Sequence, residues 1–240
     1  MGRWRSMVRV FIYLMTYDLG FAPNPFHGYC TLATCKPGIR SRAGVGDWVI
    51  GVGSKSLSRR AGREVGIDKV VYAMRVDEVL TWREYSEDPR FRAKIPSYSP
   101  NKDRPIEERG DNIYYLYEGK WYARPSFHYG RKEEMLRDLR GNVLISREFY
   151  YFGRKAIKMP EPILSELKKA GLRNGYRPYV SPRKIRNIAA DIIDWIRSLG
   201  RVGVIGEPFL FKRRYNEEFF ESEPMFVCED EALQHPPRGA

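Results

Sequence analysis

The chain has 240 residues and 42% hydrophobic content, enough for a sizeable core in one elaborated domain or in two small ones. Lys and Arg outnumber Asp and Glu by 42 to 30, and the net charge of +12 favours a polyanionic partner, with a solvated basic surface or an acidic lipid surface as alternatives. The three cysteines do not make a disulfide framework and no apolar run approaches the ~20 residues of a membrane helix, so we expect a cytoplasmic protein.

The first predicted strand begins at Val8. There Val8, Val10 and Ile12 alternate with other residues, so one face is apolar, and the run then becomes apolar on both faces. A strand with two apolar faces belongs inside a sheet. The start of the chain has two interpretations, because a start at Met7 would leave residues 1–6 as a disordered extension.

Alternation and turn residues predict the strands that follow. A polar, basic segment at residues 54–63 is interpreted as a loop, and Pro, Asn and Asp mark residues 97–110 as another. Glu118-Gly119 is typical of a hairpin turn. A short helix is predicted at residues 81–88, and strands at residues 48–53, 69–79, 111–117, 120–123, 143–145 and 149–152.

Helix signals concentrate in the C-terminal part of the chain. Residues 162–170 followed by Gly171 indicate a helix and its C-cap. Ser181-Pro182 is typical of a helix start, and isoleucines at three- and four-residue spacing predict that this helix continues to Gly200. The Pro-rich and charged residues 229–240 are predicted to be a disordered tail.

The loop from Tyr17 to Pro37 carries the densest mixture of chemical groups in the sequence. It holds three prolines, two glycines and two cysteines, together with an aspartate, a histidine and a lysine. Prolines fix the backbone and glycines permit tight approach, so the polar groups between them have little freedom. This loop is therefore the first candidate for a pre-organised site.

A set of linked motifs spans residues 11–153. They include Asp18-Leu19-Gly20-Phe21-Ala22-Pro23-Asn24-Pro25-Phe26, Cys35-Lys36-Pro37, Gly46-Asp47-Trp48-Val49-Ile50-Gly51, Asp111-Asn112-Ile113-Tyr114, His128, Val143-Leu144-Ile145-Ser146 and Phe149-Tyr150-Tyr151-Phe152-Gly153. Together they resemble a nucleotide modification associated domain family, in its second type. The resemblance implies a link to systems that modify or handle nucleic-acid bases, and it implies no particular reaction.

A looser similarity bears on the fold. The Gly46-Asp47 turn, the strand after it and the strand at residues 70–79 are similar to EVE and PUA-like domains, which bind RNA or modified bases in DNA. We therefore expect a mixed α/β (α+β) fold in which a twisted, partly closed sheet resembles a PUA-like barrel. The expected division is a β-rich domain at residues 7–158, a helical extension packed on it at residues 159–228, and the tail at residues 229–240.

Polar residues of the loop and of a second cluster are candidates for base recognition. An amide or carboxylate reads a base edge, and a lysine meets phosphate. Asp18 and Asn24 have turn capping as an equal alternative. Trp48 is placed in the site as a stacking residue, although it and Trp121, Tyr114 and Phe127 also fit a core. The expected base- or nucleotide-binding residues are Asp18, Asn24, His27, Lys36, Trp48, Asp111 and Asn112.

The densest basic patch is a candidate phosphate-binding surface. Its alternative is a solvated face, and its single sign of charge favours function. Gly51 to Ser56 lacks the glycine that a Walker motif has before its lysine, so this segment is either a phosphate contact at Lys55 or a flexible loop. The expected phosphate-binding residues are Arg40, Arg42, Lys55, Arg59, Arg60 and Arg63.

A zinc site is the weaker interpretation of the cysteines and histidines. Thiolate and imidazole suit zinc, but the spacing of His27, Cys30, Cys35 and His128 matches no strong zinc pattern. Small core residues are the alternative for the cysteines. We therefore predict no metal, and no motif identifies a cofactor.

Three hypotheses for function follow. The first is a protein of base modification that binds nucleic acid (DNA or RNA), with a modified base among its ligands, or a free nucleotide. The second is an enzyme that modifies a base or nucleotide, with Asp18, His27 or His128 as general acid or base. The third is a non-catalytic adaptor whose basic face docks on DNA or RNA.

Overall fold

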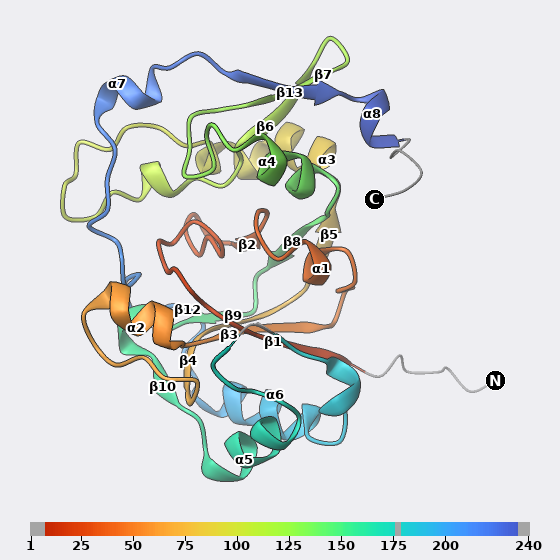
Figure 1. Cartoon of the computed structure of the whole chain (residues 1–240), viewed down its shortest axis with the longest axis vertical. Helices are drawn as coiled ribbons and strands as arrows, with labels where there is room; N and C mark the ends of the chain where they lie inside the picture. The colour runs from red at the N-terminus through yellow and green to blue at the C-terminus, as the bar shows by residue number, and fades with distance from the viewer. Residues whose placement is uncertain (1–7, 176–178, 235–240) are drawn as a thin grey trace. The chain divides into compact units, whose positions relative to one another are not determined.

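The computed structural model describes residues 8–175 and 179–234, which fall into two compact units. Each unit is assembled from three separate stretches of the chain (Figure 1). The alternative start at Met7 lies outside the described residues. The first unit contains Met1–Asp18, Ala43–Asp77 and Ser146–Phe209, and the second contains Leu19–Arg42, Glu78–Ile145 and Leu210–Ala240.

The first unit is built on one mixed sheet with the order β11-β1-β3-β4-β9-β12, and β10 also pairs with β4. Strands β1 and β3 run parallel, and β3 and β4 run antiparallel. The predicted strands near residues 8, 48, 69 and 149 are confirmed. The bounds are β1 Val10–Leu14, β3 Trp48–Val52, β4 Lys69–Arg75, β9 Phe149–Tyr151, β10 Ile157–Lys158, β11 Tyr179–Val180 and β12 Gly203–Val204.

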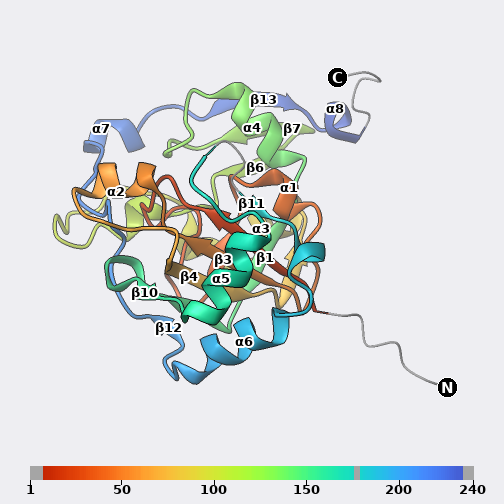
Figure 2. The same cartoon turned by 60° about the horizontal axis from the view of Figure 1, so that its bottom comes forward.

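Helices α5 (Glu161–Lys169) and α6 (Ala189–Ser198) cover one face of this sheet (Figures 1 and 2). Their buried residues, such as Leu167 and Ile196, pack with Ile12 and Ile50 of the strands. The first was predicted from the Gly171 C-cap that follows it, and the second from its isoleucine spacing. The second is shorter than expected, because the chain forms a 3₁₀ turn at Pro182–Lys184 and α6 begins only at Ala189.

The basic segment after β3 is a helix rather than the expected loop. Helix α2 (Lys55–Ala61) begins at Ser54, whose hydroxyl accepts a hydrogen bond from the Leu57 amide, and it ends at Gly62 with φ 64°. Such a serine N-cap and left-handed glycine C-cap are strong helix signals. The prediction was wrong because apolar periodicity is weak here: only Leu57 is buried.

The second unit contains two smaller sheets, of order β13-β7-β6 and β2-β8-β5. The hairpin predicted around Glu118-Gly119 is confirmed as β6 and β7. Helices α3 (Trp82–Glu87) and α4 (Lys132–Leu139) pack against the buried face of the first of these sheets. The strands are β2 Cys30–Leu32, β5 Glu78–Leu80, β6 Tyr114–Tyr117, β7 Lys120–Ala123, β8 Val143–Ser146 and β13 Met225–Glu229.

The helices of the second unit are short. The predicted helix at residues 81–88 is confirmed as α3, which Thr81 and Glu84 begin with a capping box. Residues 229–234, expected in the tail, form the end of β13 and helix α8, and residues 235–240 lie outside the described residues. The helices are α1 Pro37–Arg40, α3 Trp82–Glu87, α4 Lys132–Leu139, α7 Glu217–Phe220 and α8 Glu231–Gln234, with 3₁₀ turns at Pro89–Lys94 and Glu107–Arg109.

The mixed α+β class is confirmed, whereas the PUA-like barrel is not. Within the described residues, no sheet closes on itself: the largest one ends in the two-residue strands β11 and β12, which do not pair with each other. Over the same residues, no helix is both long and apolar enough to span a membrane.

Candidate functional site

Cys35 lies in a sharp turn between strand β2 and helix α1. Its φ is 60° and that of Lys36 is 44°, so two successive non-glycine residues adopt the left-handed conformation. This conformation is unfavourable for side chains with a Cβ, and strain of this kind clusters at functional sites. A nucleophile on a strained strand-to-helix turn is also the arrangement that presents serine in α/β-hydrolases.

Two contacts hold this turn in place. The Cys35 amide donates to Asp138 Oδ1 at 2.9 Å, and Arg40 Nε donates to the Cys35 carbonyl at 2.7 Å. Pro37 occupies the first turn of α1, where its fixed φ suits a helix start. The backbone on both sides of the thiol is therefore fixed by bonds and by proline.

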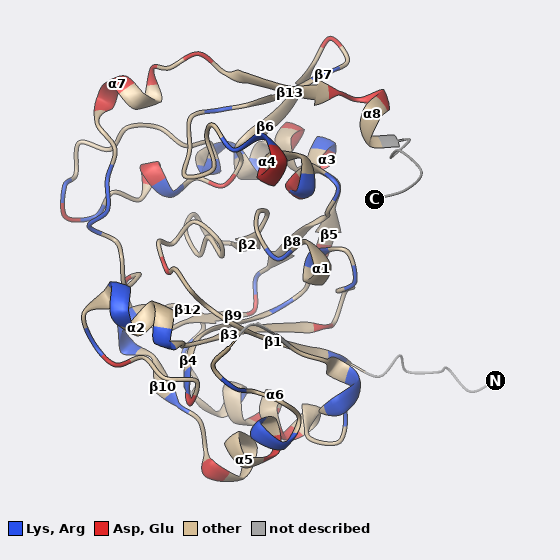
Figure 3. Ribbon diagram, viewed as in Figure 1, with Lys and Arg blue, Asp and Glu red and all other residues tan. Residues whose placement is uncertain are grey.

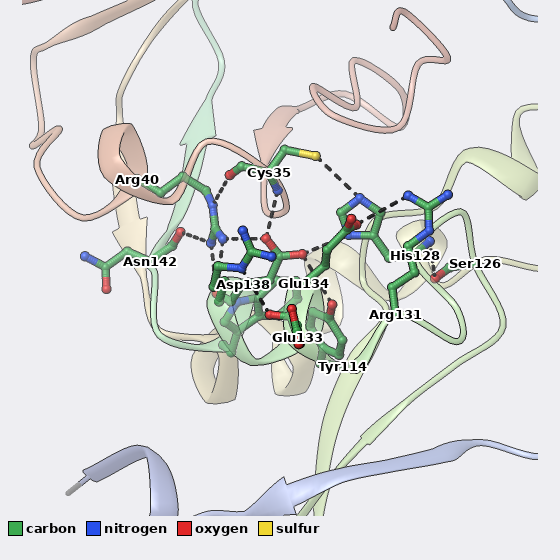
Figure 4. A network of polar contacts seen from close by, with 12 residues as sticks. Cys35, Arg40, Tyr114, Ser126, His128, Arg131, Glu133, Glu134, Asp138 and Asn142 are labelled. Atoms are coloured by element: carbon green, nitrogen blue, oxygen red, sulfur yellow. Dashed lines mark hydrogen bonds and ion pairs between the residues drawn. The ribbon is translucent and has the colours of Figure 1, made fainter. Parts of the chain in front are cut away.

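The side chains of Cys35, His128 and Asp138 form a linear series of contacts (Figure 4). Cys35 Sγ lies 3.4 Å from His128 Nε2, and His128 Nδ1 lies 2.9 Å from Asp138 Oδ2. Cys35 is partly exposed, whereas His128 and Asp138 are buried. A nucleophile beside an imidazole that a carboxylate orients is the arrangement of covalent catalysis.

Asp138 is held from several directions. The Arg40 guanidinium donates to its Oδ1 at 2.9 Å and to its carbonyl, and Tyr114 Oη donates to its Oδ2 at 3.3 Å. Trp82 Nε1 also donates to the Asp138 carbonyl, at 2.8 Å. The carboxylate therefore has little freedom to leave His128. We call Cys35, Arg40, Tyr114, His128 and Asp138 the Cys35 network.

Glycine at position 141 makes room for Arg40. A Cβ at Gly141 would lie 2.9 Å from Arg40 Nη1. The guanidinium is fully buried and also donates to the Asn142 carbonyl at 2.8 Å. Arg40 was predicted to bind phosphate. Its hydrogen-bond donors are instead directed at the protein's own carbonyls and at Asp138.

His128 is the charged partner of the thiol at neutral pH. Burial by itself lowers the pKa of His128, but the hydrogen bonds to Asp138 and Cys35 and their charges outweigh it and raise the pKa to about 10. The imidazolium nitrogen Nε2 therefore lies 3.4 Å from the Cys35 sulfur. Burial lowers the pKa of Lys36, the residue next to the thiol, and the charge of Cys35 opposes that shift.

A second buried polar cluster lies in the same unit, and we call Asn24, Thr31, Tyr85, Lys94 and Asp111 the Lys94 network. Lys94 Nζ donates to Asn24 Oδ1 at 2.6 Å and to the Tyr29 carbonyl at 3.0 Å. Thr31 and Tyr85 both donate to the Asp111 carboxylate, at 2.6 and 2.7 Å. Burial lowers the pKa of Lys94 to about 8, and it raises the pKa of Asp111.

Three predicted base-binding residues, Asn24, Asp111 and Asn112, are buried within the second unit, and a fourth, His27, is not. Asn24 accepts from the Phe26 amide and donates to the Arg109 carbonyl, so it braces the loop's backbone. Asp111 belongs to the Lys94 network, and Asn112 donates to the Phe91 carbonyl at 3.2 Å. His27 is exposed, with φ 59°, and burial and the charge of Lys94 lower its pKa.

Two further predicted residues belong to the first unit. Asp18 is 1% exposed and accepts hydrogen bonds from Tyr151 Oη and from the Phe209 amide. Trp48 is in the core, where its ring stacks on Tyr150. The structure thus assigns packing or bracing contacts to these residues, and their role in base recognition stays a prediction.

Helix α2 carries basic residues, blue in Figure 3, and their side chains are exposed. Arg60 lies over the ring of the exposed Tyr17, with its Cζ 4.0 Å from the ring centroid. Arg42, in the second unit, is exposed and donates to the Gly38 carbonyl. The exposed residues on or beside α2 are Lys55, Arg59, Arg60 and Arg63.

Sequence reasoning missed two members of the site. Cys35 was considered only as a zinc ligand or a core residue, and Asp138 was not considered at all. The helix that carries Asp138 was also missed, although Met135 and Leu139 give it an apolar spacing of four residues. That spacing, with Asp138 on the same buried side, is the signal that was available.

The structure bears on the zinc interpretation as well. Cys30 is fully buried, which raises the pKa of its thiol, and His27 is exposed. Of the four residues considered as zinc ligands, Cys35 and His128 are hydrogen-bonded to each other. No other pair of these four is hydrogen-bonded among the described residues. In the part of the chain that the structure describes, no group of three or more His, Cys, Asp or Glu side chains is arranged to hold a metal ion.

Comparison with known protein families places the chain in one of them. A family model described as nucleotide modification associated domain 2 matches residues 7–215 of the chain. No curated protein and no solved structure matches the chain. The matched range includes all three residues of the linear series, Cys35, His128 and Asp138, and it ends before strand β13.

Proposed function

Because the chain belongs to the nucleotide modification associated domain 2 family, we propose that it is an enzyme that acts on a nucleobase or nucleotide through the thiol of Cys35. The single observation that carries this proposal is the contact of Sγ with His128 Nε2, together with that of Nδ1 with Asp138. A buried cysteine that only fills space needs no oriented imidazole beside it.

The chemistry that suits this arrangement is transfer of an acyl-type group. The Cys35 thiolate attacks the carbonyl carbon, a C–S bond forms, and the bond from that carbon to its leaving atom breaks. His128 donates its Nε2 proton to the leaving atom. Water or an amine then attacks the thioester, gives its proton to His128 and releases the thiolate. Asp138 keeps the ring in place through Nδ1.

The family supports a nucleobase or nucleotide as the substrate. Nucleobases carry exocyclic amines, and an acyl or carbamoyl group on such an amine presents a carbonyl carbon with nitrogen as the leaving atom. The same steps run in reverse would load that group onto a base. His128, predicted as a general acid or base, acts as both in this proposal, with Cys35 as the nucleophile that the sequence did not assign.

An activated ester tests the nucleophile. The protein is incubated with 4-nitrophenyl acetate, and release of nitrophenolate and acetylation of the Cys35 peptide are followed by absorbance and mass spectrometry. We expect a burst of nitrophenolate that is absent in Cys35→Ala and about 100-fold slower in His128→Gln. Cys228→Ala is the matched control, because Cys228 is also partly exposed and is not one of the three residues in the series.

A nucleoside acylated on its exocyclic amine tests the substrate class. Deacylation faster than that of an acylated aniline of similar reactivity supports action on a base. Equal acetylation of Cys35 and Cys228, or a His128→Gln variant as fast as the wild type, contradicts the role of the thiol itself.

A binding role is the second candidate, and the exposed cations of helix α2 favour it. Lys55, Arg59, Arg60 and Arg63 lie on or just after one short helix, and Tyr17 beneath Arg60 offers a ring to a base. We propose that this surface contacts phosphates, as the sequence predicted. Duplex and single-stranded DNA and RNA should bind with a steep salt dependence.

Charge reversal tests that surface. The double variant Arg59→Glu, Arg60→Glu should lower affinity at 50 mM salt at least tenfold and flatten the dependence of log K on log salt. Lys168→Glu, Lys169→Glu on helix α5 is the control of equal charge change. Equal losses from both double variants would mean that only net charge matters.

A further inference from the structure

The solvent-facing side of the sheet β13-β7-β6 carries a row of aromatic rings. Tyr115 of β6 is the direct partner of Tyr122 on β7, and Tyr122 is the partner of Phe226 on β13. The first two rings are stacked at 5.7 Å, and the second pair meets edge to face at 6.1 Å. We call these three residues the aromatic row.

The opposite face of the same sheet is the buried one. Side chains alternate along a strand, and Tyr114, Trp121 and Val227 are all buried next to the row's members. The core residues of α3 and α4 pack on that side. The rings of the aromatic row are therefore not needed to close the core of this unit.

The row is open to solvent at Phe226, and its other members, Tyr115 and Tyr122, are partly exposed. Phe226 is 42% exposed, and Tyr117, two residues beyond Tyr115 on the same face, is 59% exposed. Exposed aromatic rings that lie side by side on one face of a sheet are a feature of binding surfaces. Apolar rings at these positions gain little from burial, so the hydrophobic effect alone would favour polar side chains there.

A cation lies at each end of the row. The Arg124 guanidinium is 4.3 Å from the centroid of Tyr115, and Lys132 Nζ is 5.4 Å from that of Phe226. Burial lowers the pKa of Arg124, and its charge opposes the rise in the pKa of Tyr115 that burial causes. Both ends of the row thus present positive charge beside an aromatic face.

The acidic groups of this region lie mostly at the strand ends. Glu118 is in the hairpin turn, and Glu229 is the cross-strand partner of Lys120 near that turn. Glu223 is the carboxylate that acts on Tyr115, and its effect on the pKa of Tyr115 is smaller than that of Arg124. At Tyr115, therefore, the charge of Arg124 has a larger effect than that of Glu223.

We propose that this face binds single-stranded nucleic acid, with two or three bases stacked on the aromatic row and phosphates near Arg124 and Lys132. Strands lie about 4.8 Å apart, so the row spans about 10 Å, which suits two or three stacked bases. Stacking tolerates every base, and a guanidinium plane such as that of Arg124 also accepts one. This surface is separate from the Cys35 network, and β13 lies beyond the range that the family model matches.

The test measures binding of labelled 12-nucleotide single-stranded DNA and RNA to the full chain by fluorescence anisotropy. Phe226→Leu keeps apolar volume and removes the ring, so we expect the Kd to rise about tenfold. Phe226→Tyr keeps the ring and should bind like the wild type. Lys132→Gln should reduce the slope of log K against log salt by about the amount expected for one phosphate contact. Comparing the Kd for DNA with the Kd for RNA shows which of the two nucleic acids this face binds.

Two results would overturn the proposal. One is equal affinity of the wild type, Phe226→Leu and Tyr122→Leu, or no binding at all. The other is self-association of the wild type that Phe226→Leu abolishes while leaving nucleic-acid affinity unchanged, which would assign the face to a second copy of the chain. Neither result bears on acetylation of Cys35, so this proposal and the enzymatic one fail separately.

Discussion

The Cys35 network and the Lys94 network are two buried polar clusters in the same unit, and they differ in where their contacts end. Each has one carboxylate, Asp138 or Asp111, and one buried cation, Arg40 or Lys94. The contacts of the Cys35 network end at a partly exposed sulfur. Those of Lys94 end at carbonyls of the loop's own backbone.

The two cations also differ in kind. Arginine stays charged in proteins, so Arg40 requires Asp138 at all accessible pH values. Lysine loses its proton readily when buried, and the pKa of Lys94 is lowered to about 8 by that effect. The Cys35 network therefore fixes charge beside a nucleophile, whereas the Lys94 network fixes a loop. A buried polar cluster is a candidate site when a reactive atom at its end reaches solvent.

The largest effect should come from removing the carboxylate of Asp138. Asp138→Asn leaves the buried Arg40 without its counter-ion and should lower the free energy of unfolding by about 3–5 kcal/mol. Asp111→Asn should cost only about 1–3 kcal/mol, because Lys94 can release its proton and Thr31 can still donate to the amide oxygen. Urea denaturation of both variants measures the difference. Equal losses would mean that the two networks are alike.

Next in size is the reactivity of the thiol. Cys35 should be alkylated by iodoacetamide at pH 7 at least tenfold faster than Cys228, because the imidazolium of His128 stabilises the thiolate. Cys30, which is fully buried, should react only on unfolding. Peptide mass spectrometry over time gives the three rates. In His128→Gln the advantage of Cys35 should disappear, and its persistence would show that the imidazole does not activate the sulfur.

The pH dependence of stability should have opposite signs in the two networks. The pKa of His128 is raised from 6.5 to about 10, so its contribution is complete below pH 6.5 and is lost as the pH rises toward 10. The pKa of Lys94 is lowered from 10.5 to about 8, so protonated Lys94 destabilises the fold below pH 8. This cost is relieved, and stability rises, as the pH rises from 8 toward 10.5. Between pH 6.5 and 8 the wild type should therefore lose stability relative to His128→Gln. Parallel curves for the two proteins in urea titrations at these pH values would contradict the charged state of His128.

The smallest effect concerns Thr34, the residue before the nucleophile. Its hydroxyl is buried and has no hydrogen-bond partner among the described residues. Thr34→Val removes that unsatisfied group at equal volume, so the melting temperature should stay the same or rise slightly. Thr31→Val, in the Lys94 network, removes a hydroxyl that donates to Asp111 and should lower the melting temperature. A lower melting temperature for Thr34→Val would indicate a partner for its hydroxyl.

Much of the secondary structure followed from the sequence. The alternation at Val10 and Ile12 and the isoleucine spacing up to Ile196 predicted β1 and the end of α6, because each pattern repeats at the period of the element. The capping residues around α2 were present in the sequence, but its weak apolar pattern hid the helix. For the candidate site, the sequence singled out the loop that carries Cys35 but did not assign Cys35 as a nucleophile. Asn24 of that loop and Asp111, outside it, make bracing contacts.

The sequence by itself determined the basic charge, the α+β class, the family and the loop that carries Cys35. Only the tertiary structure decided that Cys35 meets His128 and Asp138, which are 93 and 103 positions away along the chain. Local patterns report a residue's neighbours within a turn or two, whereas this contact depends on how α1, α4 and the β2 turn pack. For the same reason, the sequence predicted that Arg40 binds phosphate, whereas in the fold Arg40 is the buried counter-ion of Asp138.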